Sequence, residues 1–357
     1  MKYEFMPLSP IHIGNGTEIY PYEYVIQNEM LYKINFAEII NKIPNNDKLV
    51  KLMMKDIVKL RQEINKHYEP KFGYIKKMPV SYSVAKLYKE KLAYTARRNE
   101  NNQLILLAFI DSLEREYIPG STIKGALRGA LLSQIAYEED DLDYTLIKTP
   151  KGAIKGVSPF LKAQNLEKNY LEYRDVKEDP FKALKITDAR GELVVGGYQA
   201  TMYVYKPKRT TFEPAIPIQM VCADGFLQNN NVNCMYGNLS INEDYFNHKM
   251  AKGIAFNSKQ LIKSVNEKAS KMIDVELEFF RRVNYGDTLE VYTQIKSYFD
   301  NMDKNTQMLV RLGRGAGMNS TTFNLVNKGR ELKTDPRSRL LVENKYPLGW
   351  GVISFVE

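Results

Sequence analysis

The chain has 357 residues, 44% of them hydrophobic and 26% charged, a balance that suits a folded globular protein with room for two domains. Lys and Arg outnumber Asp and Glu by 51 to 42, and the resulting net charge of +9 favours a polyanionic partner. With two cysteines, no CxxC motif and three scattered histidines, the sequence argues against a disulfide framework and a zinc knuckle, and it predicts neither a metal nor a cofactor.

The first ten residues contain no apolar segment of the kind found in signal peptides. No apolar run in the chain approaches the roughly 20 residues that span a bilayer. The sequence therefore predicts a cytoplasmic protein without a membrane partner.

The chain opens with short strands. Alternating apolar residues predict a strand within residues 2–13, and His12 and Asn15 lie at its end, where Gly14 and Gly16 predict a turn. The elements predicted next are a hairpin of residues 20–26 and 30–36, a single helix from Asn46 or Asp47 to His67, a loop with room for short helical pieces over 68–100, and a buried strand over 104–110.

The central stretch, residues 117–136, predicts a helix with three different faces. Pro119 and Gly120 form a turn signal, after which Ser121 or Thr122 could cap the first backbone N–H groups. The row expected to be buried consists of Ile123, Leu127, Leu131 and Ile135.

Two further features of this stretch bear on function. Gly125 and Gly129 form a strip without side chains, and because glycine costs roughly 1 kcal/mol in a helix interior, we expect something to approach the backbone there. Lys124 and Arg128 share another face. A helix N-terminus with two hydroxyls and two cations favours a phosphate, whereas the alternative is a core helix whose cations are merely solvated.

The second half begins after an acidic run at 138–143, which we interpret as a solvated loop, and a segment rich in Pro, Gly and charges over 144–180. Pro214 and Pro217 place the third strand of this half at a sheet edge. The elements predicted here are strands over 184–187, 192–205 and 209–221, a loop over 222–238, a helix from Asn257 or Ser258 to Val283, and strands over 307–312 and from Trp350.

The late motif RLGRGAG, residues 311–317, predicts a phosphate-binding loop. Its glycines, Gly313, Gly315 and Gly317, would let backbone N–H groups approach a phosphate, and Arg311 and Arg314 would supply charge. A plain tight turn is the alternative. Met318 stands where a dinucleotide fingerprint needs glycine, and the chain has no Gly-Lys dipeptide, so Rossmann and P-loop sites are disfavoured.

Serine hydrolase signals are not convincing. Ser121 to Lys124 matches S-x-x-K, but no SDN or KTG element accompanies it, and no G-x-S-x-G occurs. His12 is the one histidine in a setting suited to metal-independent RNA cleavage, where it would act as a base on a 2′-hydroxyl. A structural role or an RNA contact is the alternative for this residue.

Five motifs in this order resemble the RAMP superfamily of CRISPR-associated proteins, and more narrowly the Csm subunit of type III-A effectors that caps the 3′ portion of the guide RNA. They are PIHIGNGTEI near the N-terminus, YIPGSTIKGALRGAL in the middle, KITDAR at 185–190, LVRLGRGAG late and PLGWGVISF at the end. The resemblance implies an α+β fold of two ferredoxin-like, RRM-type domains with long insertions, here residues 1–178 and residues 179–357.

The resemblance also implies a function. It predicts a subunit that is not an enzyme, binds the crRNA, contacts the repeated backbone RAMP subunit and the small subunit of the Csm complex, and supports guide maturation by recruiting a host ribonuclease. The expected RNA-binding residues are His12, Asn15, Ser121, Thr122, Lys124, Arg128, Arg311, Gly313, Arg314, Gly315 and Gly317. Two alternatives stay open: a RAMP endoribonuclease that cuts repeat RNA, and a scaffold that contacts only protein.

Overall fold

The computed structural model describes the following parts of the chain. These are residues 1–43, 46–92, 104–138, 146–148, 154–157, 163–230, 233–247, 253–317, 320 and 337–356. Most of the acidic run and Met318 lie outside the described residues.

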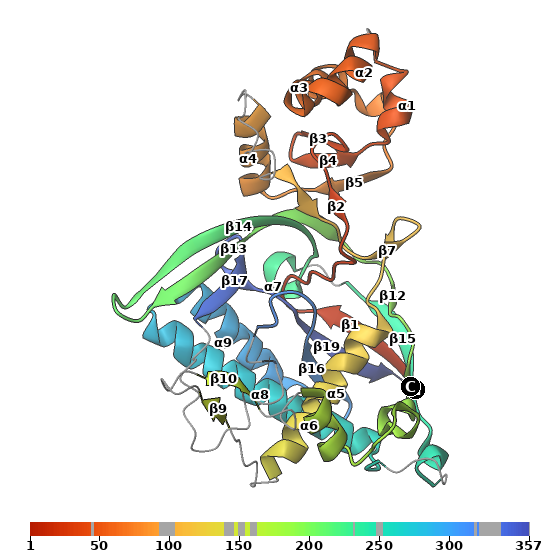
Figure 1. Cartoon of the computed structure of the whole chain (residues 1–357), viewed down its shortest axis with the longest axis vertical. Coiled ribbons are helices and arrows are strands. Elements are labelled where there is room, and N and C mark those ends of the chain that lie inside the picture. The colour runs from red at the N-terminus through yellow and green to blue at the C-terminus, as the bar shows by residue number, and fades with distance from the viewer. Residues whose placement is uncertain are drawn as a thin grey trace.

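The first large sheet joins the two ends of the chain (Figure 1). Its central strand, β1, lies antiparallel between a strand from the middle of the second half and the C-terminal strand. Tyr3 and Phe5 alternate with more exposed residues along β1 and are fully buried, as the period-2 pattern predicts. The strands in order are β11 (Leu184–Ile186), β15 (Met235–Ile241), β1 (Lys2–Pro7), β19 (Trp350–Val356) and β16 (Gln307–Arg311), with β12 (Arg190–Gly191) beside β15.

The second large sheet is built around a long hairpin. Its order is β18 (Tyr346–Pro347), β17 (Ser338–Val342), β13 (Val195–Lys206), β14 (Thr211–Ala223), β6 (Leu106–Leu107) and β2 (Glu18–Ile19). β14 pairs with β6 only at Gln219 and Met220, so Pro214 and Pro217 lie where β14 is paired on one side among the described strands. The strand as a whole is not at the edge of the sheet, because β14 lies between β13 and β6, but the two prolines stand in its singly paired part, where a missing N–H costs no ladder bond to a second neighbour.

Two long helices pack together against the first sheet. α5 (Gly120–Glu138) and α8 (Ser258–Arg282) contact each other, and they also contact β11 and β16 respectively (Figure 1). The predicted cap of α8 is confirmed, because the Asn257 side chain accepts a hydrogen bond from the Gln260 N–H at 2.9 Å. The helix α9 (Gly286–Asn301), which the sequence analysis did not anticipate, packs on α8.

A small lobe stands at one end of the molecule, at the top of Figure 1. The single helix predicted before His67 is wrong, because the Asp56 side chain accepts the Lys59 N–H at 3.0 Å and starts a second helix. The segment predicted to be a loop over 68–100 contains both a strand and a helix. The lobe comprises β3 (Tyr24–Gln27), β4 (Met30–Lys33), β5 (Lys76–Pro79), α1 (Phe36–Ile40), α2 (Asn46–Lys55), α3 (Ile57–His67) and α4 (Tyr82–Leu92).

The remaining elements are short. The region predicted as a loop over 222–238 in fact contains a helical turn, α7, and the first residues of β15. These elements are β7 (Asp111–Ser112), β8 (Arg115–Glu116), β9 (Leu146–Lys148), β10 (Ile154–Val157), α6 (Ala163–Tyr170), α7 (Phe226–Asn229) and 3-10 turns at Pro70–Phe72, Val176–Glu178, Pro180–Lys182 and Glu243–Asn247.

The mixed α+β architecture predicted from the sequence is confirmed. The predicted boundary between residues 178 and 179 does not separate two sheets, however. The first sheet combines β1 with strands from the second half, and the second sheet combines β2 and β6 with strands from the second half. The two ferredoxin-like domains stay a prediction.

Candidate nucleic-acid interface

The glycine-rich loop after β16 depends on glycine at three positions. Gly313, Gly315 and Gly317 have φ values of 73°, 80° and 76°, a left-handed region that other residues rarely adopt. Gly313 and Gly317 are exposed, and so is the Arg314 side chain between them. The loop therefore offers bare backbone and a cation on the surface.

This loop is held against the end of the N-terminal segment. The Arg314 N–H donates to the His12 carbonyl at 2.9 Å. A side chain at Gly313 would collide with the same carbonyl, so the two motifs approach each other as closely as backbones can. The motifs PIHIGNG and LGRGAG are thus neighbours in space, although they are some 300 residues apart in sequence.

The His12 side chain is buried, with 2% of its surface exposed. Its Nδ1 lies 2.7 Å from the Val221 carbonyl, which only a protonated Nδ1 can bond, and this leaves Nε2 as the acceptor nitrogen. Burial lowers the pKa of the imidazole despite the bond to Val221, and the charge of Arg314 lowers it further. The ring is therefore neutral at physiological pH.

The turn after His12 is fixed by a local bond pattern. The Asn15 carboxamide oxygen accepts from the Thr17 N–H at 2.9 Å and from its hydroxyl at 2.6 Å. Gly14 lies against the imidazole, since a side chain there would come within 3.0 Å of Nε2 of His12. Asn15 itself therefore shapes the turn, and its exposed position leaves the remaining amide N–H groups accessible.

These features meet in one groove of about 350 Å³, which we call the three-motif groove. It brings together the N-terminal turn, the first turn of α5 and the glycine-rich loop, three stretches that the sequence analysis had singled out separately. Its walls include His12, Gly14, Gly16, Thr122, Gly313 and Arg314.

The start of α5 differs from the prediction. Ser121 and Thr122 are not caps but lie within the first turn, because the helix begins at Gly120. The Asp188 carboxylate, from the KITDAR motif, accepts the Gly120 N–H at 2.9 Å. A side chain at Gly120 would come within 2.5 Å of the Ile186 carbonyl. The central motif and KITDAR therefore form one packed unit.

The two cations predicted to face a phosphate have partners inside the protein. The Lys124 ammonium donates to the Leu184 carbonyl at 2.7 Å, and burial, with the nearby charge of Lys185, lowers its pKa. The Arg128 side chain is 19% exposed and donates to both oxygens of Asp179 at 2.9 Å. These contacts account for the position of both cations without RNA, so their role in binding stays a prediction.

Arg128 is the centre of a wider cluster. It also donates to the Glu167 carboxylate at 3.1 Å and to the Tyr173 hydroxyl at 2.9 Å. Its guanidinium carbon lies 5.0 Å from the centre of the Phe181 ring. The cluster fastens α5 to the segment that contains α6 and the 3-10 turns after it.

Arg311 and Arg314 differ in exposure, since Arg311 is buried and Arg314 is exposed. The Arg311 side chain is 3% exposed and donates to the carbonyls of Leu348 and Gly315, each at 3.1 Å. Its guanidinium lies 5.4 Å from the Trp350 ring and 3.9 Å from the Glu276 carboxylate. Arg311 thus stabilises the loop through contacts inside the protein, and Arg314 is the arginine of this motif that lies at the surface.

The structure reveals polar residues that the sequence analysis did not single out. Glu276 of α8 is buried and accepts from Arg339 at 2.6 Å, forming with Arg311 a buried charged cluster. Lys268 of α8 is also buried, and burial lowers its pKa to about 8. Lys268 stands within the apolar stripe of α8, between Val265 and Met272, where it contacts α5 through the Gly129 carbonyl.

Neither a metal centre nor a membrane segment is found in the described part of the chain. No group of three His, Cys, Asp or Glu residues there could hold a metal ion. The described helices include none that is long and apolar enough to cross a bilayer.

Comparison with known sequences identifies relatives. The sequence profile of the RAMP superfamily matches residues 4–321. A relative described as CRISPR system Cms protein Csm5 from Methanocaldococcus jannaschii is 25% identical over 342 residues, which are 91% of this chain and 73% of the relative. A protein of the same description from Streptococcus thermophilus is 24% identical over 208 residues, covering 53% of this chain and 51% of the relative.

Two solved structures share the fold. A chain of the cryo-EM structure of a Csm–crRNA–target RNA ternary complex from a type III-A CRISPR-Cas system superposes with a TM-score of 0.67 at 16% identity. That match covers 99% of this chain and 100% of the other. The crystal structure of T. onnurineus Csm5 gives a TM-score of 0.64 at 17% identity, over 98% of this chain and 99% of that one.

Proposed function

This chain belongs to the RAMP superfamily, and from that premise we propose that it is the subunit of a type III-A CRISPR complex that holds the 3′ portion of the guide RNA without cutting it. The similarity to two proteins named Csm5 supports the assignment to the Csm complex. The fold shared with a chain of a Csm–crRNA–target RNA complex agrees with it.

The observation that carries the RNA-binding part is the convergence of three motifs in the three-motif groove. The groove offers glycine backbone, an exposed Arg314 and the first turn of α5, and such groups bind phosphate and ribose rather than base edges. A guide has a different sequence for each target, so its holder must tolerate any sequence. Backbone contacts meet that requirement.

Further parts of the proposal follow from the resemblance. The partners would be the crRNA, the repeated backbone RAMP subunit and the small subunit, and a recruited host ribonuclease would trim the guide in the cytoplasm. We further propose that the fold consists of two ferredoxin-like units. The glycine-rich loop after β16 would belong to the unit that contains the first large sheet.

A binding measurement and a crosslinking measurement test the central proposal. Fluorescence anisotropy of the purified chain with labelled single-stranded RNAs of unrelated sequence should give similar affinities that fall with salt. Ultraviolet crosslinking in the assembled complex should yield guide RNA adducts at the three-motif groove. Absence of adducts anywhere on this chain would favour the scaffold alternative and reject the proposal.

One observation favours a second candidate function, that of a metal-independent ribonuclease. The neutral His12 imidazole lines the groove with Nε2 as its acceptor nitrogen, the protonation state that a general base needs. Purified protein should be incubated with repeat RNA and chelator, beside the His12→Ala variant. We expect intact RNA in both cases, and cleavage that disappears in the variant would establish the ribonuclease instead.

A further inference from the structure

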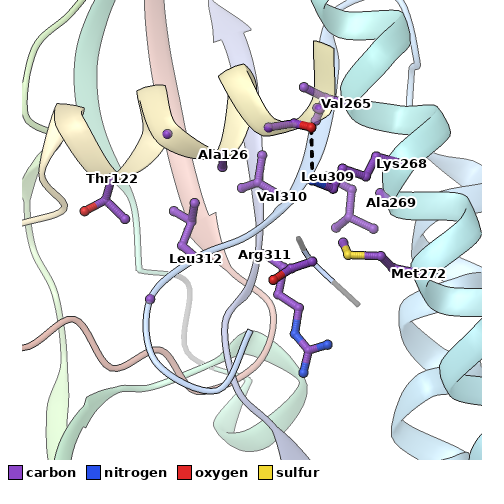
Figure 2. A pocket seen from close by; sticks show the side chains of 15 residues that line it. Thr122, Ala126, Val265, Lys268, Ala269, Met272, Leu309, Val310, Arg311 and Leu312 are labelled. Carbon is purple, nitrogen blue, oxygen red and sulfur yellow. Dashed lines mark hydrogen bonds between the residues drawn. The ribbon is translucent and has the colours of Figure 1, made fainter. Parts of the chain in front are cut away.

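A second cavity, of about 250 Å³, lies between α5 and α8 above β16. Figure 2 shows Thr122 and Leu312 at one end and Lys268 of α8 at the other. Thr122 and Gly313 line both this cavity and the three-motif groove, so the two adjoin at the glycine-rich loop. We call it the interhelix cavity.

The α5 wall of the interhelix cavity includes the predicted glycine strip, Gly125 and Gly129. A side chain built at Gly125 would meet no atom of the described residues within 4 Å, apart from its chain neighbours and the nearby backbone of its own helix. Gly125 is exposed, so its missing side chain leaves open space instead of serving a contact within this chain. The strip therefore keeps the backbone accessible from the cavity.

Lys268 is the unusual residue of the cavity. Only 9% of its surface is exposed, and its ammonium makes one hydrogen bond among the described residues, to the Gly129 carbonyl at 3.1 Å. The Ser133 hydroxyl already donates to that carbonyl at 2.8 Å, so the carbonyl does not require the lysine. No carboxylate of the described chain forms an ion pair with Lys268.

The charges around Lys268 leave its cavity positive. Arg311 is the other charged residue that lines it, and no acidic residue of the described chain does so. Lys268 also lines an adjoining cavity together with Glu267 and Lys271 of its own helix, whereas the α5 side chains that line the two cavities are uncharged. A buried ammonium without an anion is costly, and an anion in the cavity would remove that cost.

We propose that the interhelix cavity is a phosphate site for the bound RNA, in which the Lys268 ammonium is the charged ligand and the glycine strip admits the phosphate. The cavity has space for roughly eight water molecules, which is ample for one phosphate group. The inference rests on the proposed function, because it places part of the same RNA beyond the three-motif groove.

The test compares the wild-type chain with Lys268→Met and with Lys263→Met, an exposed lysine on the same helix that serves as the matched control. Anisotropy is measured with a labelled 20-nucleotide single-stranded RNA across a salt series. Lys268→Met should weaken binding about fivefold or more and lower the salt slope by about 0.7, the value for one phosphate contact on a single strand. Lys263→Met should stay within about twofold of the wild type.

Two forms of the RNA separate the sources of phosphate. The same oligonucleotide is used with a 3′-hydroxyl and with a 3′-phosphate. An equal loss of affinity for both forms identifies a backbone phosphate. A loss confined to the 3′-phosphate form identifies a terminal one.

A measurement on the wild type removes the dependence on variants. The Lys268 ammonium is titrated by lysine-detected NMR with and without the 20-nucleotide RNA, and its pKa should rise when a phosphate lies beside it. The phosphate site would be rejected, and the proposed function kept, if the wild type binds RNA but the pKa of Lys268 does not move and Lys268→Met binds RNA as the wild type does. Failure of the wild type to bind RNA would reject the proposed function itself.

Discussion

At the scale of single residues, the two arginines of the glycine-rich loop have different surroundings. Arg311 and Arg314 both belong to the RLGRGAG motif, and the sequence offers both as cations of the loop. In the structure Arg311 is held between Trp350, Glu276 and two carbonyls, while Arg314 is exposed beside the groove. An arginine that already uses its donors internally has few left for RNA.

Substitutions of the two arginines should therefore have different effects. Arg314→Ala should weaken RNA binding and lower the salt slope by about 0.7, with the free energy of unfolding unchanged within about 0.5 kcal/mol. Arg311→Met should lower the free energy of unfolding by about 3 kcal/mol, because it disrupts a buried charged cluster. Urea denaturation and anisotropy on both variants measure the stability and the RNA affinity. An Arg311→Met variant as stable as the wild type would contradict the structural role of Arg311.

Arg128 offers a related contrast. Its bonds to Asp179, Glu167 and Tyr173 predict that Arg128→Met lowers the free energy of unfolding by about 2–4 kcal/mol. Urea denaturation measures that change, with anisotropy on the folded variant as the second reading. Intact stability combined with a marked loss of RNA affinity would instead support the phosphate contact expected from the sequence.

The low pKa of Lys268 makes a prediction about stability and pH. Burial holds the pKa at about 8 in the folded chain, against 10.5 as the ordinary value, so between these pH values the unfolded chain binds more protons. The free energy of unfolding should then rise with pH across this window, by about 3 kcal/mol in total from this group. Urea denaturation at each pH gives the free energy of unfolding, and subtracting the pH profile of Lys268→Met from that of the wild type isolates the contribution of Lys268. Two parallel profiles would contradict the prediction.

At the scale of elements, α5 shows how one helix uses glycine for opposite purposes. Gly120 is enclosed, with carbonyls of Ile186 and Thr187 at 2.5 and 2.8 Å from the place of a side chain. Gly125 faces open space. Sequence spacing alone does not distinguish these roles, because both glycines stand in the same helical stretch.

Alanine at the two positions should give opposite changes in stability. Gly120→Ala should lower the free energy of unfolding by about 1–3 kcal/mol, because backbone atoms must move. Gly125→Ala should raise it by up to about 1 kcal/mol through helix propensity, while weakening RNA binding if the glycine strip admits a phosphate. Thermal unfolding and anisotropy measure both effects, and a destabilised Gly125→Ala variant would show that the strip serves packing.

At the scale of the whole molecule, the sheets tie the ends of the chain together. β1 pairs with both β15 and β19, and the glycine-rich loop rests on the segment that follows β1. The groove therefore exists only when the first dozen residues and the last quarter of the chain are both in place.

Fragments test the predicted boundary. We expect residues 1–178 expressed alone to lack a cooperative unfolding transition, because β1 loses both of its neighbours, β15 and β19, and β6 loses β14. Circular dichroism during thermal unfolding of each fragment, and of the two mixed together, measures this. Cooperative unfolding of both isolated halves would instead support two independent domains.

The sequence by itself determined the superfamily, the α+β class, the long helices α5 and α8, and the glycine-rich loop. The superfamily comes from the resemblance carried by five motifs, and the other features follow from local signals: apolar periodicity, caps and glycines that need positive φ. It missed α9, it allowed only short helical pieces where α4 lies, and it joined α2 to α3 across Asp56.

Only the tertiary structure decided which charges are used inside the protein. Arg128, Arg311 and Lys124 look available in sequence, yet partners of all three come from segments 35 to 60 residues away. The KITDAR motif marks the neighbourhood of Asp188 but not its bond to Gly120, and the roles of Asp188 and Lys268 arise from the contacts of α5 with distant elements. The physical reason is that burial and pairing depend on what the folded chain brings alongside a residue, which the residues next to it in sequence do not record.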